Sequence, residues 1–194
     1  MAVVKRLCVF CGSSADVDQR YRDAATELGG LLARSGVELV YGGGRVGLMG
    51  LLADAALAAG GRVAGVIPRF LHDREVAHTG LSELIVVASM HERKRRMFDI
   101  ADAFVALPGG LGSLDETIEI VTWRQLALHD KPVVIVDVAG YWAPLRALVE
   151  HAIAAGFAPS HARDLFHMVP SVADVLPFLT RLPPPRKAAE GRLA

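Results

Sequence analysis

The chain has 194 residues, a length that favours one domain. Hydrophobic residues make up 52% of it and charged residues 22%, and no apolar run is long enough to predict a membrane-spanning helix. Lysine plus arginine (21) balances aspartate plus glutamate (21), so binding to the backbone of nucleic acids is disfavoured. The first residues lack the pattern of a secretion signal, and we expect a cytoplasmic protein.

Short apolar runs rich in Val, Ile and Leu alternate along the chain with segments of helical periodicity. This alternation is typical of βαβ units, in which helices cover both faces of a parallel sheet. The sequence therefore predicts one α/β domain over residues 1–182, with a Rossmann-like, doubly wound parallel sheet of about seven strands. The predicted strands are residues 3–10, 37–41, 62–67, 84–88, 103–107, 132–138 and, more weakly, 166–169.

The first predicted helix is the clearest of six. Apolar residues recur at helical spacing from Tyr21 to Leu32, and Gly36 follows as a stop signal. Residues 69–82 are polar and irregular, and residues 183–194 are predicted to form a Pro-rich flexible tail. The other predicted helices are residues 47–59, 90–101, 114–128, 142–155 and 172–179.

The two cysteines, Cys8 and Cys11, form a C-x-x-C pattern that can indicate a redox pair or half a zinc site. Here the pattern lies in the apolar run of residues 7–11, just before Gly12 and at the end of the first predicted strand. Side chains three positions apart in a strand point to opposite faces, about 10 Å from each other and beyond disulfide reach. We therefore expect two buried structural thiols.

Three glycine-rich segments each follow a predicted strand. Ligands of open α/β sheets bind beyond the carboxyl ends of the strands, so these segments should line one nucleotide-sized pocket. Their candidate ligand contacts are Gly12 and Ser13 after the first strand, Gly43 and Gly44 after the second, and Gly109, Gly110, Leu111, Gly112 and Ser113 after the fifth.

The third segment is the most informative. Pro108 ends the strand, the glycines let backbone N–H groups approach an anion, and the start of the following helix attracts phosphate. The same residues fit a capping box, in which the Ser113 hydroxyl caps the Glu116 N–H and the Glu116 carboxylate reaches back. The two interpretations can coexist.

The second segment also fits the dinucleotide fingerprint G-x-G-x-x-G from Gly42 to Gly47. That fingerprint belongs after the first strand, with an acidic residue at the end of the next one. Here it follows the second strand, and the next strand ends in Ile67-Pro68-Arg69. NAD binding is therefore disfavoured.

The basic run at residues 93–96 is by default a solvated helix face. Helical geometry, however, places Arg93 and Lys94 on either side of the apolar stripe of the helix. An inward guanidinium needs an anionic partner, because leaving it unpaired in a dry site would be costly. Arg93 is thus a candidate for binding phosphate or a carboxylate.

Glu116 shares a helix face with Ile120 and Trp123, so its carboxylate can point inward, where it would stay ionised if it faced Arg93. Glu75 lies in the irregular segment and is by default exposed. The sequence contains no H-E-x-x-H, G-x-S-x-G or P-loop motif, and its histidines lack ligand spacing. We expect no metal site.

Two of these motifs together resemble those of the LOG (Lonely guy) family. Residues 108–116, PGGLGSLDE, resemble its PGGxGTxxE motif, and residues 90–94, MHERK, resemble its M-H-x-R-K motif. The likeness extends over roughly residues 7–145. The family hydrolyses cytokinin riboside 5'-monophosphates to the free base and ribose 5-phosphate, so the resemblance implies this activity, with no metal or organic cofactor.

The resemblance also implies roles for particular residues. Arg93 and Glu116 correspond to the catalytic pair, and a serine, Ser113, stands where the family has threonine but keeps the hydroxyl. The implied nucleotide contacts are Glu75, Arg93, Lys94, Gly110, Leu111, Gly112, Ser113, Leu114, Asp115, Glu116 and Thr122.

The resemblance further implies a homodimer with the site near the subunit interface, and a nucleoside 5'-monophosphate as the small-molecule partner. A competing hypothesis is a nucleotide or cofactor carrier without catalysis, similar to the molybdenum-cofactor carriers of the same fold. A third is a structural homodimer with a degenerate pocket. Lysine decarboxylase, an older label for such proteins, is rejected because none of the four lysines lies in a recognisable motif for pyridoxal phosphate.

Overall fold

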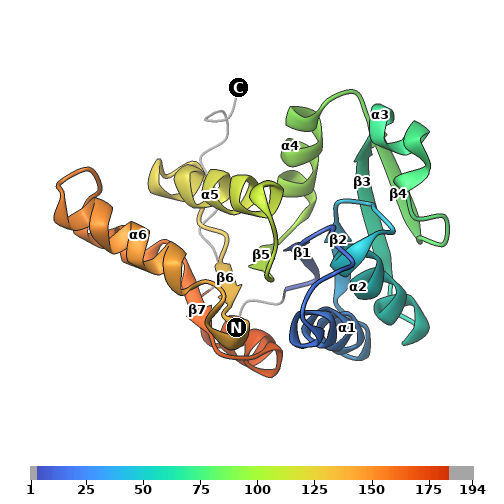
Figure 1. The fold of residues 1–194 in the computed structure, drawn as a ribbon, viewed down its shortest axis with the longest axis horizontal. Helices are drawn as coiled ribbons and strands as arrows, with labels where there is room; N and C mark the ends of the chain where they lie inside the picture. Colours follow the sequence, from blue (N-terminus) through green and yellow to red (C-terminus); the bar gives the residue numbers. More distant parts are fainter. Residues whose placement is uncertain (1–3, 184–194) are drawn as a thin grey trace.

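The computed structural model describes residues 4–183, except for the side chains of Glu75 and Val76. The predicted tail lies outside the described residues from position 184 onward. Seven parallel strands form one sheet in the order β4-β3-β2-β1-β5-β6-β7, which confirms the predicted α/β fold (Figure 1). The strands are β1 (Arg6–Phe10), β2 (Glu38–Tyr41), β3 (Val63–Pro68), β4 (Glu83–Val87), β5 (Ala103–Ala106), β6 (Val133–Val136) and β7 (His167–Val169).

The central strands are apolar throughout because helices cover both of their faces. In β1, Leu7 and Val9 belong to one core cluster, whereas Cys8 and Phe10 belong to the cluster on the opposite face. Cys8 and Cys11 are free, buried and on opposite faces of the sheet, as predicted. Burial raises the pKa of both thiols well above the ordinary value.

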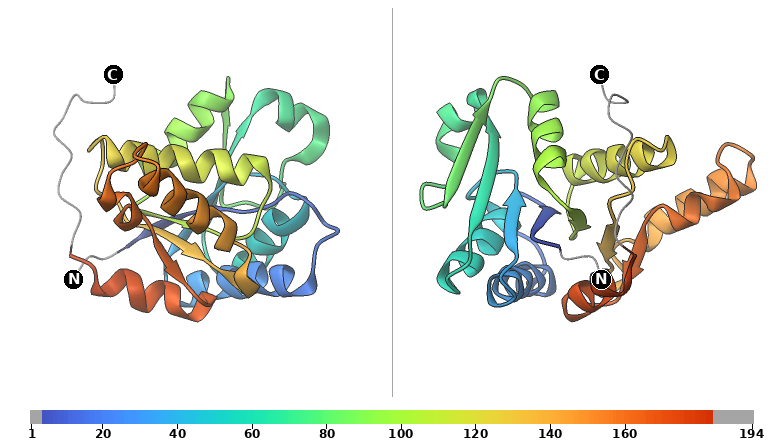
Figure 2. Two further views of the ribbon diagram at one scale, coloured as in Figure 1. Left: turned by 60° about the vertical axis from the view of Figure 1, so that its left-hand side comes forward. Right: turned by 180° about the vertical axis from the view of Figure 1, so that it is seen from behind.

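The helices divide into two layers. Those covering the first face are α1 (Gln19–Arg34), α2 (Gly47–Ala58) and α7 (Val175–Arg181). The other face carries α4 (Met90–Ile100), α5 (Leu111–Gln125) and α6 (Ala143–Ala154). In the right-hand view of Figure 2, the far end of α6 projects beyond the sheet. Short 3-10 segments lie at Val138–Gly140, Ser160–Asp164 and Val172–Asp174.

Three predicted boundaries were wrong. Segment 69–82 is not wholly irregular, because it forms α3 (Arg69–Leu71) and a π-helical turn over His72–Val76. The last helix begins at Val175, after a 3-10 turn, instead of at residue 172. Helix α5 begins at Leu111 instead of residue 114, because glycine is itself favourable at the N-cap, which Gly110 occupies.

The order of the strands reverses at β1, which pairs with β2 on one side and with β5 on the other. The loops that follow these three strands therefore meet at one edge of the sheet. The Gly12 N–H donates to the Pro108 carbonyl at 3.1 Å, which joins the loop after β1 to the loop after β5. Such a switch point is where doubly wound proteins form their ligand crevice.

Candidate active site

A cavity of about 490 Å³ opens at this switch point. Its wall includes parts of all three predicted glycine-rich segments, and the two predicted catalytic side chains also line it. The predicted residues that line the cavity are Gly12, Ser13, Gly44, Arg93, Gly110, Leu111, Gly112, Ser113 and Glu116.

An ion pair between two helices lies in the cavity wall. Arg93, on α4, donates from Nη1 to Glu116 Oε1, on α5, at 2.8 Å, and from Nε to the Val66 carbonyl at 3.1 Å. The two side chains are only 10% and 9% exposed. The structure thus brings together the inward cation and the inward carboxylate that helical periodicity predicted.

Two features of the site shift the pKa of Glu116 in opposite directions. Burial raises the pKa of Glu116 above the ordinary value, and the charge of Arg93 opposes the rise. Arginine stays charged at any accessible pH, so the pair holds a carboxylate beside a permanent cation in a partly dry cavity.

Gly42 makes room for this ion pair. A Cβ atom at position 42 would overlap Nη2 of Arg93. The glycine pattern after β2 predicts a ligand-binding loop and does not predict this packing role. The steric requirement arises from α4, about 50 residues further along the chain, so no local pattern could reveal it.

The start of α5 offers unpaired backbone donors to the cavity. Gly110 is the N-cap residue, and no side chain caps the helix. A Cβ atom at Gly110 or Gly112 would meet no protein atom within 4 Å, so packing within the protein does not require glycine there. Open space over the first turn of a helix is the geometry in which backbone N–H groups bind an anion.

The predicted capping box does not form. Ser113 lies inside the first turn, and its carbonyl accepts the Thr117 hydroxyl at 2.6 Å. The Glu116 carboxylate pairs with Arg93 instead of reaching back to the helix start. Because the helix begins two residues before Ser113, that residue is not at the N-cap position that the motif needs.

Lys94 points to the other side of α4 and takes part in a separate ionic network. Its Nζ lies 3.1 Å from Asp115 Oδ2 and 3.0 Å from Glu119 Oε1, and its side chain is 12% exposed. The network connects α4 to α5 beside the Arg93–Glu116 pair. Neither Lys94 nor Asp115 lines the cavity of the described chain.

The remaining predicted contacts also lie outside the lining of this cavity. Gly43 has a φ of 74° and accepts the His78 N–H through its carbonyl, and Gly109 packs beneath Ser113. Leu114 is half-buried on α5, and Thr122 is exposed further along that helix. The side chain of Glu75 lies outside the described residues.

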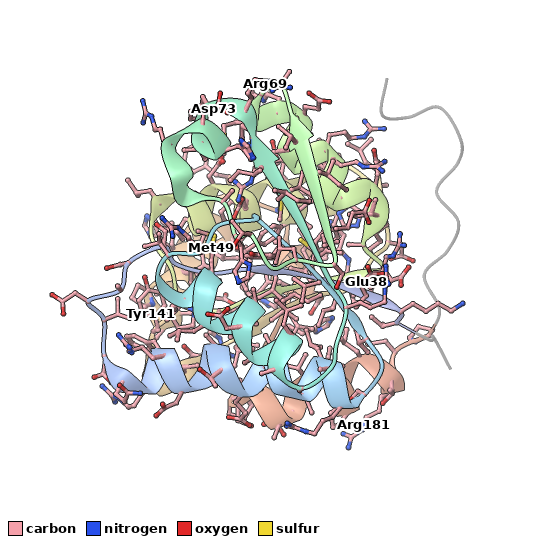
Figure 3. All side chains as sticks on the ribbon, turned by 90° about the vertical axis from the view of Figure 1, so that its right-hand side faces the viewer. Glu38, Met49, Arg69, Asp73, Tyr141 and Arg181 are labelled. Carbon is pink, nitrogen blue, oxygen red and sulfur yellow. The ribbon has the colours of Figure 1, made fainter. Side chains whose placement is uncertain are left out.

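Sequence reasoning missed the apolar part of the wall. Val46, Met49, Ile67 and Leu71 line the same cavity as the start of α5. Met49 is labelled in Figure 3, on α2. Such residues have the same periodicity as core positions, so no signal in the sequence separated them from the core.

In the described part of the chain, no group of three His, Cys, Asp or Glu side chains is arranged to hold a metal ion. Within the same residues, no helix is long and apolar enough to span a membrane.

Fold and site together define a Rossmann-like α/β protein with a cavity at the switch point, a helix start that no side chain caps and a buried Arg–Glu pair. The family described as "Possible lysine decarboxylase" matches residues 49–179. Cytokinin riboside 5'-monophosphate phosphoribohydrolase LOG1 of Arabidopsis thaliana is 46% identical over 89% of this chain and 81% of its own length. A probable enzyme of the same description, LOGL9 of Oryza sativa, is 49% identical over 89% of this chain and 76% of its own length. The chain belongs to this LOG family.

Solved structures with this fold include the molybdenum cofactor carrier protein of Chlamydomonas reinhardtii. It superposes with a TM-score of 0.69 at 23% identity, covering 91% of this chain and 96% of that one. The molybdenum cofactor binding protein of Rippkaea orientalis has a TM-score of 0.68 at 19% identity, covering 93% and 98% of the two chains. These likenesses show the shared fold.

Proposed function

We propose that the protein hydrolyses the N-glycosidic bond of cytokinin riboside 5'-monophosphates, which are N6-modified derivatives of AMP, and releases the free base and ribose 5-phosphate. The observation that carries the proposal is the buried Arg93–Glu116 pair beside an uncapped helix start in one cavity. The names of the relatives support the same reaction.

The helix start binds the substrate, and the ion pair acts in the chemical step. The first-turn N–H groups of α5, around Gly110 and Gly112, bind the 5'-phosphate, because they are unpaired and face open space. Fixing the phosphate positions the reacting bond of the same molecule, so that binding energy at one end lowers the barrier at the other.

Glu116 stabilises the transition state. Breaking the bond between C1' of the ribose and the base nitrogen transfers the electron pair to the base and leaves positive charge on the sugar ring. The carboxylate of Glu116 stabilises that charge, water adds to C1', and the base leaves with a proton in place of the sugar. Arg93 holds Glu116 in place through the 2.8 Å contact.

The decarboxylase description of the family does not fit this site. A pyridoxal-dependent enzyme needs a lysine amine free to form a Schiff base. Lys94 Nζ contacts two carboxylates, and Lys131 Nζ donates to the Phe98 carbonyl at 2.6 Å. Neither lysine lines the cavity.

The test is incubation of the purified protein with AMP and with isopentenyladenosine monophosphate, followed by chromatography for released base. We expect release of the base from at least one of the nucleotides. The competing hypothesis is a nucleotide carrier on the same fold. Saturable binding with no base released would favour the carrier and contradict the proposed reaction.

We also propose that the protein acts as a homodimer in which α5 contributes to the interface. Leu111, Ile118 and Leu126 are exposed by 85%, 41% and 60%. Leu111 and Ile118 share one face of α5 with Thr122, and Leu126, the C-cap residue, continues that face. This stripe begins at the rim of the cavity, because Leu111 also lines it. A partner subunit on this face would cover the apolar residues and bring Thr122 into a shared site.

A further inference from the structure

Tyr141 contacts the glycine-rich loop before α5, at Gly109. The proposed reaction does not use this contact. The Tyr141 hydroxyl donates to the Gly109 carbonyl at 2.5 Å, across 32 positions of sequence. Tyr141 is absent from the lining of the cavity, and so is Gly109, whereas the next residue, Gly110, lines it. The contact therefore lies on the side of the loop that does not face the cavity.

A peptide bond transmits this contact to the cavity. The Gly109 C=O and the Gly110 N–H belong to one planar trans peptide, in which they point in opposite directions. A hydroxyl that holds the carbonyl on the outer side consequently holds the Gly110 N–H on the opposite side of the peptide. A peptide between two glycines has few steric restraints of its own, so it needs an external anchor to keep one orientation.

The loop that carries Tyr141 has a fixed backbone conformation, which determines where the side chain lies. Ala139 adopts a left-handed conformation with a φ of 53°, which is costly for a residue with a side chain and persists only where the surroundings fix it. The Trp142 N–H donates to Asp137 Oδ1 at 2.7 Å, which closes the loop at the residue after Tyr141.

Aromatic packing also holds the Tyr141 ring. It stands edge-on to Trp142 at 5.0 Å and to Tyr21 of α1 at 5.4 Å between ring centroids. Figure 3 shows Tyr141 beside the N-terminal end of α1. The ring is therefore fixed without its hydroxyl, which is left to hold the glycine loop.

We infer that Tyr141 is a positioning residue, whose hydroxyl orients the Gly109–Gly110 peptide so that the start of α5 binds the 5'-phosphate of the substrate. The inference rests on the proposed function only for the identity of the substrate. The hydroxyl acts on phosphate recognition and touches neither the sugar nor the base.

The test compares Tyr141→Phe with Tyr21→Phe, which removes a hydroxyl from the neighbouring ring and serves as a matched control. Calorimetric titration with ribose 5-phosphate and with AMP should show about three- to tenfold weaker binding to Tyr141→Phe, the effect of losing one hydrogen bond. Binding of adenosine, which lacks the phosphate, should be unchanged in both variants. In kinetics, KM for the nucleotide should rise more than kcat falls.

Two outcomes would overturn the inference. One is wild-type affinity of Tyr141→Phe for ribose 5-phosphate. The other is an equal loss of AMP and adenosine binding, which would indicate a purely structural role. These results are separate from the fate of the proposed reaction, because wild-type protein that binds AMP without releasing base would disprove the reaction and leave the binding comparison intact.

Discussion

Two features of its environment act on the charge of Glu116 in opposite directions, and they determine what a substitution does. Burial disfavours its charge, while Arg93 at 2.8 Å favours it. A carboxylate beside a cation in a partly dry cavity stabilises nearby positive charge more strongly than it would in water. The proposed chemical step therefore depends on the charge of Glu116 more than on its size.

Glu116→Gln keeps the size of the side chain and an oxygen that can accept from Arg93, but removes the charge. We expect kcat to fall by about 10²- to 10⁴-fold, with a melting temperature close to that of the wild type and with ribose 5-phosphate binding retained. Steady-state kinetics and calorimetry measure both effects. Full turnover in the variant would contradict the assignment, and a collapse of the melting temperature would show a mainly structural role.

The pH dependence of the reaction should reflect the raised pKa of Glu116. The proposed mechanism requires the ionised form of Glu116, which gives way to the protonated form as the pH falls through that pKa. Because burial raises the pKa, kcat/KM should fall on the acid side at a pH above the ordinary glutamate value of about 4.3. A pH–rate profile checks this, and an acid limb at or below the ordinary value would contradict it.

Gly112 offers a test in which stability and binding should change in opposite directions. Gly112→Ala adds a methyl group to open space in the first turn of α5, so it should stabilise the protein by up to about 1 kcal/mol through helix propensity. The same methyl group occupies the space proposed for the phosphate, so AMP should bind more weakly. Thermal unfolding and calorimetry measure the two effects, and adenosine binding is the control.

At the scale of elements, the close packing of α1 against α2 depends on Gly29. A Cβ atom there would overlap the carbonyl oxygen of Leu52 on α2 and lie 3.0 Å from the Ala56 nitrogen. Both are backbone atoms, so the helices themselves would have to separate. The neighbouring Gly30 differs, because its Cβ would meet only the flexible end of the Arg34 side chain.

Gly29→Ala should therefore destabilise the protein by about 1–3 kcal/mol, since the inserted methyl group forces the two backbones apart. Gly30→Ala, the matched control on the same helix, should be neutral or stabilising because alanine favours the helix. Chemical denaturation measures both. Equal effects of the two substitutions would contradict the packing argument.

At the scale of the whole molecule, the exposed stripe on α5 makes the oligomeric state testable. Ile118→Glu places a charge in the centre of the stripe, so we expect the proposed dimer to dissociate to monomers, as measured by light scattering after size-exclusion chromatography. Leu148→Glu is the control, because Leu148 is 62% exposed on a different helix, α6. If only the control variant dissociates the dimer, or if the wild type is a monomer, the proposed interface is wrong.

The sequence by itself determined the elements and the candidate chemistry. All seven strands lie where short apolar runs placed them, because strands covered on both faces need continuous hydrophobic residues. The inward direction of Arg93 and Glu116 followed from helical periodicity, which is a local property.

Only the tertiary structure decided what these residues meet. It paired Arg93 with Glu116, placed Gly42 where a side chain would displace the guanidinium, engaged Lys94 with two carboxylates and brought Tyr141 to the Gly109 carbonyl. Each of these contacts joins segments more than 20 residues apart, and which segments meet depends on strand order and helix packing. Periodicity gives the direction of a side chain, whereas its partner is set by the elements that pack against it.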